Sequence, residues 1–89
     1  MEIRIYYKKN LKLSQQKLAA ACTHIGKELG RLKGDTNPQQ DVVMVLAASD
    51  KKFEDYKDYA INYKEYLSWV HVDHASPDNT EVAVGWIEN

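Results

Sequence analysis

The sequence has few of the residues that cross-link or anchor small proteins. Cys22 is the one cysteine among 89 residues, so no internal disulfide can form and no Cys-x-x-Cys pair is present to bind a metal. No apolar run approaches the roughly 20 residues that span a bilayer, and the N-terminal segment alternates charged and apolar residues. We therefore expect an untargeted, cytoplasmic protein in a reducing compartment, with no membrane partner and no structural metal.

Length and composition predict one small globular domain over residues 1–89. The chain is 44% hydrophobic and 28% charged, which is typical of a folded, water-exposed domain. A domain of this size buries a limited core, so dimerisation is one way to add stability.

The net charge of −1 conceals an uneven distribution of charge. Residues 1–34 hold eight basic and two acidic side chains, a balance of +6, whereas residues 35–89 hold four basic and eleven acidic ones, a balance of −7. A basic half can bind nucleic-acid phosphates. Unlike halves can equally contact each other in a homodimer or bind a protein partner, and charge can simply solvate helix faces.

Hydrophobic periodicity predicts the first half of the fold. Residues 2–7 alternate apolar and polar side chains, as a strand does. Ser14 is a good N-cap for a helix that carries an apolar stripe to about Leu32, and Gly34 is a plausible stop. Residues 42–48 are a continuous apolar run, typical of a strand buried on both faces. We expect that strand at the centre of a sheet.

The second half predicts one more helix and two more strands. The helix begins at Ser49 or Asp50 and ends near Asn62, and the strands cover residues 66–72 and 80–87, with a loop between them. The order β-α-β-α-β-β requires crossover connections, so we expect a small α/β fold with two or three layers. Its mixed four-stranded sheet should have three parallel strands and one antiparallel strand.

Polar side chains follow the expected parallel strands, where ligands of α/β sheets usually bind. Lys8, Lys9 and Lys12 follow the first strand, and Lys17 lies in the first turn of the next helix, where a cation is disfavoured unless it serves an anion. Asp73 follows the third strand. Amines, a helix N-terminus and a carboxylate at one rim predict a site that holds a phosphate or an ester and activates water.

The basic turn and the first helix resemble the first motif of the type-2 peptidyl-tRNA hydrolases, Lys-Met-x-x-Gly-Lys-(Ile/Leu)-Ala-Ala-Gln-x-x-His. Leu13 stands in for Met, and weaker likeness covers most of the remaining chain, including the strand that ends in Asp73. The positions that match the motif are Lys12, Lys17, Leu18, Ala19, Ala20 and His24.

The resemblance implies hydrolysis of the ester that joins a peptide to tRNA, without a cofactor. Lys17 would then stabilise charge on the attacked carbonyl or contact the terminal phosphate or ribose, and Asp73 would orient or deprotonate the water. These two residues are the candidate catalytic residues. Lys8, Lys9 and Lys12 are the candidate contacts to tRNA phosphates.

Two departures from the family pattern support an alternative. Gln16 replaces the glycine of the first motif, and residues 74–80 lack the family's Gly-Arg-Thr. The alternative is a non-catalytic protein-binding or regulatory module on the same fold, of a size that would suit a phage genome. We expect His24 to be a structural histidine, Cys22 to lie in the core and His71 to pack under the sheet.

Overall fold

The computed structural model describes residues 2–34, 42–74 and 79–88. These ranges confirm the α/β fold and the predicted order of elements, while the middle of the predicted loop before the last strand lies outside the described residues. The elements are β1 (Glu2–Lys8), a 3₁₀ turn η1 (Lys9–Leu11), α1 (Gln15–Lys33), β2 (Val42–Ala48), α2 (Asp50–Tyr63), β3 (Ser68–Asp73) and β4 (Thr80–Ile87).

Both helices begin at a serine that caps the first turn. The Ser14 Oγ accepts a hydrogen bond from the Lys17 backbone N–H at 3.2 Å, and the Ser49 Oγ accepts one from the Lys52 N–H at 3.3 Å. Gly34 ends α1 in the left-handed region, with a φ of 72°, as its position in the sequence predicts. In the described part of the chain, neither helix is long and apolar enough to cross a membrane.

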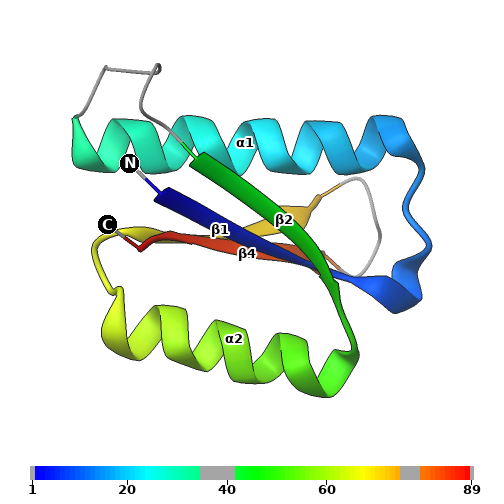
Figure 1. Cartoon of the computed structure of the whole chain (residues 1–89). Helices are drawn as coiled ribbons and strands as arrows, with labels where there is room; N and C mark the ends of the chain where they lie inside the picture. The colour runs from blue at the N-terminus through cyan, green and yellow to red at the C-terminus, as the bar shows by residue number, and fades with distance from the viewer. Residues whose placement is uncertain (1, 35–41, 75–78, 89) are drawn as a thin grey trace.

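The sheet has the strand order β2-β1-β4-β3. The first strand pairs in parallel with β2 and antiparallel with β4, and β3 also pairs antiparallel with β4. Three strands therefore run in one direction and β4 in the other, as predicted. In Figure 1, α1 lies above the sheet and α2 below it, so the fold has three layers.

Each helix buries one stripe against its own face of the sheet. On the α1 side, Ile25 and Leu29 pack against Ile5 and its neighbours. Gly85 on β4 permits this approach, because a Cβ built there would lie 2.5 Å from the Ile25 Cγ2 atom. On the α2 side, the fully buried Phe53 belongs to a second cluster with Ala48, Ala60, Val84 and Trp86.

The prediction that residues 42–48 form a central strand is wrong. The β2 strand lies at the edge of the sheet and pairs with β1 alone. Its five large side chains, Val42 to Leu46, are between 38% and 56% exposed, and of its seven residues Ala48 alone is buried. An apolar run favours burial on both faces, but in this chain the helices pack mainly over β4, β1 and β3 and leave β2 largely uncovered except at Ala48.

Candidate groove between α1 and β3

A groove of about 660 Å³ lies between α1 and β3, within the range of roughly 300–1,000 Å³ that small-molecule sites occupy. Its wall is mixed, with apolar side chains from both elements and polar side chains between them. The lining residues are Leu13, Lys17, Ala20, His24, Glu28, Trp69, Val70, His71, Val72, Asp73, His74 and Val82.

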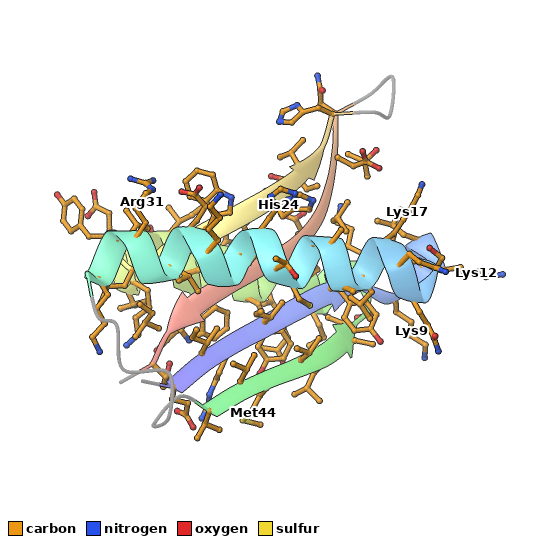
Figure 2. All side chains as sticks on the ribbon, turned by 90° about the horizontal axis from the view of Figure 1, so that it is seen from above. Lys9, Lys12, Lys17, His24, Arg31 and Met44 are labelled. Atoms are coloured by element: carbon orange, nitrogen blue, oxygen red, sulfur yellow. The ribbon has the colours of Figure 1, made fainter. Side chains whose placement is uncertain are left out.

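The α1 wall of the groove is a single helical stripe. Lys17, Ala20, His24 and Glu28 follow one another at spacings of three, four and four residues, which places them on one face of α1. In Figure 2, Lys17 and His24 both lie on the side of α1 that faces away from β2. Because the neighbouring stripe of α1 is buried against the sheet, the orientation of this polar stripe is fixed by core packing.

The β3 wall brings a second set of titratable groups to the same groove. His71 and Asp73 are two residues apart on β3, and His74 follows the end of the strand. A β-bulge lies between His71 and Val72, where the pairing register of β3 with β4 shifts. The His74 Nδ1 lies 3.2 Å from the Asn79 Oδ1, a hydrogen bond that links the end of β3 to the residue before β4.

His24 and His71 stack across the groove. Their ring centroids are 5.2 Å apart and their planes differ by 10°. Burial and the neighbouring His24 lower the pKa of His71, Asp73 opposes this effect and His74 adds to it. The lowered pKa favours the neutral imidazole of His71, the form that can accept a proton.

The two ends of the groove differ in charge. Lys17 is exposed in the first turn of α1, beside the positive end of the helix dipole. At the other end, Glu28 is paired with Arg31, whose Nη2 and Nε atoms lie 2.6 and 3.1 Å from the Glu28 Oε2. The Arg31 guanidinium therefore compensates the charge of the Glu28 carboxylate.

The structure places the two candidate catalytic residues, Lys17 and Asp73, in the same groove. The three candidate phosphate contacts lie outside the lining. The Lys8 Nζ sits 4.9 Å from the centre of the Phe53 ring, on the α2 side of the sheet. Lys9 and Lys12 are exposed in and just after η1, near the N-terminal end of α1 (Figure 2). Their contact with tRNA stays a prediction.

Sequence reasoning missed the contribution of the two histidines. His24 was expected to be structural and His71 to pack under the sheet, yet both line the groove. The signal was present in the spacing: His24 is seven residues after Lys17 on a helix, and His71 two residues before Asp73 on a strand. Cys22 packs against the α1-side core as predicted, and burial raises the pKa of its thiol.

Within the described ranges, no three His, Cys, Asp or Glu side chains are arranged to hold a metal ion. Comparison with protein families, with curated proteins and with solved structures finds no match for this chain.

Proposed function

We propose that the groove between α1 and β3 hydrolyses the ester that joins a peptide to tRNA. The observation that carries the proposal is that Lys17 and Asp73, which are far apart in the sequence, line one groove with a neutral imidazole. The likeness of the first helix to the peptidyl-tRNA hydrolase motif selects this ester among possible substrates. A cytoplasmic location would follow, because the substrate arises during translation.

The groove residues divide the reaction into two tasks. The Lys17 ammonium stabilises the negative charge that develops on the ester carbonyl when water attacks it, an effect that is strong at a preorganised site. Asp73 orients the attacking water, and the His71 imidazole accepts its proton. The tetrahedral intermediate then collapses, the bond to the ribose oxygen breaks, and that oxygen takes up the proton. The products are tRNA with a free ribose hydroxyl and the peptide carboxylic acid, which releases its remaining proton to water and leaves as the carboxylate.

The tRNA itself would lie toward the N-terminal end of α1. Lys9 and Lys12 extend the positive charge of Lys17 beyond the groove on that side, and both are exposed (Figure 2). Contacts of lysines with phosphates supply affinity that does not depend on base sequence and that falls steeply with salt. The lysines therefore bind the backbone, and the groove receives the terminal ribose and the ester.

The test is hydrolysis of N-acetyl-aminoacyl-tRNA by the wild type, Lys17→Ala and Lys17→Arg. Removal of one preorganised group of this kind reduces the rate by about 10²–10³-fold, and arginine should restore part of it. Lys27→Ala is the matched control, since Lys27 is also an exposed lysine of α1 but lies outside the groove. Wild-type protein without activity, or equal rates in the wild type and Lys17→Ala, would overturn the proposal.

A second candidate is a non-catalytic binding module, and the observation that favours it is the absence of arginine from the described lining of the groove. Arginine forms a two-pronged contact with phosphate that neither histidine nor lysine reproduces. Such a protein-binding or regulatory module would bind tRNA weakly and in a strongly salt-dependent manner, would release no peptide, and would bind a protein partner or a second copy of the chain. Binding and hydrolysis measured on the same preparation therefore separate the two functions.

A further inference from the structure

The outer edge of β2 has no strand partner in the described part of the chain. One side of its backbone forms the parallel ladder with β1, from Glu2 opposite Val42 to Lys8 opposite Ala48. The N–H and C=O groups on its other side face outward from the edge of the sheet, and a row of such groups is a template for another strand. The strand is seven residues long, enough for a complete ladder.

Both faces of β2 are apolar. The register with β1 places Val43 and Val45 on the α1 side, beside Ile3 and Ile5, and places the alternate residues on the α2 side. The residues on the α2 side are Val42, Met44, Leu46 and Ala48. A strand that met water on its outer side would instead carry polar residues on at least one face.

The opposite edge of the same sheet is protected, and β2 is not. The β3 strand is interrupted by a bulge and carries His71 and Asp73. Bulges and charged side chains are the usual means by which soluble proteins prevent edge-to-edge pairing. The β2 strand has neither a charged residue nor a proline, and its ladder with β1 runs without a register shift.

We propose that β2 pairs antiparallel with β2 of a second copy of this chain, joining the two sheets into one continuous sheet of eight strands. The interface is this apolar edge, not the charge-divided contact that composition suggests. Since β2 carries no charge, pairing with itself brings no like charges together. The flanking strand differs in charge at its ends, with Glu2 beside Val42 and Lys8 beside Ala48. Antiparallel alignment places the unlike ends of the two β1 strands at the same side of the interface, about 14 Å apart across the two β2 strands, whereas parallel alignment would place the like ends there.

Symmetry makes the arrangement specific. Two identical antiparallel strands are related by a two-fold axis perpendicular to the sheet, and this operation keeps each side chain on the same face. Therefore one residue of β2 must lie directly opposite its own counterpart. The α1 helices of both copies then lie on one side of the joined sheet and the α2 helices on the other. The dimer leaves both grooves uncovered, because each groove lies beside β3, at the edge of the sheet opposite β2 (Figure 2).

The first test is the molar mass of the purified chain, measured by sedimentation equilibrium across a range of concentrations. The wild type should be a dimer, while Met44→Lys and Val45→Lys, one on each face of β2, should raise the dissociation constant at least tenfold. Ile61→Lys is the matched control, because Ile61 is also an exposed apolar residue, at 50%, but belongs to α2 and not to the β2 edge. A monomeric wild type, or a dimer that neither β2 substitution weakens, would overturn the proposal.

A mixing experiment excludes misfolding as the cause of dissociation. Met44→Lys and Met44→Glu should each be monomeric with a wild-type circular dichroism spectrum. Their mixture should form a heterodimer, because an axis at residue 44 or 45, the middle of β2, makes the two oppositely charged side chains facing or diagonal neighbours. If the mixture remains monomeric, the placement of residue 44 at the interface is wrong.

A cysteine scan then tests the two-fold axis. In a Cys22→Ser background, single cysteines at positions 43 to 47 are exposed to mild oxidation. The position at the axis should form an intermolecular disulfide much faster than its neighbours, because Cα atoms of facing residues are about 4.5–5.5 Å apart, within the range of disulfides. Equal cross-linking at all positions, or none, would contradict antiparallel pairing. None of these substitutions is in the lining of the groove, so these experiments test dimerisation independently of the proposed hydrolase activity.

Discussion

The two edges of the sheet are built from different residues. The β3 edge carries histidines and an aspartate, is interrupted by a bulge and forms one wall of a groove, whereas the β2 edge is a flat apolar strand. Both edges belong to the same small sheet, and two strands separate them. The titratable groups and the exposed apolar strand thus lie at opposite edges of the sheet, so a substitution at one edge leaves the other edge intact.

Among the changes that distinguish the two edges, loss of the Asp73 carboxylate from the β3 edge should have the largest effect on activity. Asp73→Asn keeps the size of the side chain but loses its charge, and we expect hydrolysis of N-acetyl-aminoacyl-tRNA to fall by about 10²-fold, because the attacking water loses the carboxylate that orients it. The dimer dissociation constant should stay unchanged. Wild-type turnover in this variant would remove Asp73 from the proposed reaction.

Substitution of Gly85 on the central strand β4 should have the next largest effect, on the free energy of unfolding. The added methyl group of Gly85→Ala would meet Ile25, so α1 must move outward, and overpacking of this kind destabilises by about 1–3 kcal/mol. Urea unfolding measures the change. Gly26→Ala is the matched control, because nothing lies within 4 Å of its Cβ position and alanine favours a helix by up to about 1 kcal/mol. Equal stability of the two variants would contradict close packing of α1 on β4.

The N-terminal serine caps of α1 and α2 can be removed one at a time. Ser14→Ala removes the cap beside Lys17, and Ser49→Ala removes the cap that follows β2, each at about 1 kcal/mol of unfolding free energy. We expect Ser14→Ala to reduce tRNA hydrolysis more than Ser49→Ala does, although both lose similar stability. Steady-state rates and urea midpoints are measured for both variants. Equal losses of activity would contradict the prediction that the Ser14 cap helps to position the groove residues.

The smallest expected effect concerns pH. The folded pKa of His71 lies below its ordinary value of about 6.5, so below that pH the unfolded chain binds more protons than the folded chain. This contribution to stability is complete above about pH 6.5 and declines as the pH falls toward the folded pKa. His71→Gln should therefore lose less stability between pH 7.5 and 5.5 than the wild type, as measured by urea midpoints. Identical losses would contradict the lowered pKa.

The helices were predictable because their signals are local. Ser14, Ser49 and Gly34 act within one turn of the chain, and the structure places both helix starts and the end of α1 where these residues indicate. The strand at residues 80–87 was equally clear from its composition. Neighbours along the chain supply all of this information.

The position of β2 and the histidine pair were not predictable, because each depends on distant segments. The apolar run at residues 42–48 has the same sequence pattern whether its faces are covered by this chain or by another molecule. Likewise, the stacking of His24 on His71 requires the particular approach of α1 to β3. Lys17 and Asp73 could be proposed from sequence because both follow the ends of predicted strands, and Lys8 could not be placed because its contact with Phe53 is tertiary.

The two tryptophans lie in different surroundings, and this gives the molecule two built-in optical reporters. Trp69 lines the groove and is 37% exposed, whereas Trp86 is 3% exposed in the α2-side cluster, where its ring lies 5.4 Å from that of Tyr6. In a Trp86→Phe variant the remaining indole emission arises from the groove alone. A nucleic acid or peptide entering there would change its intensity and wavelength, so occupancy can be followed without any label.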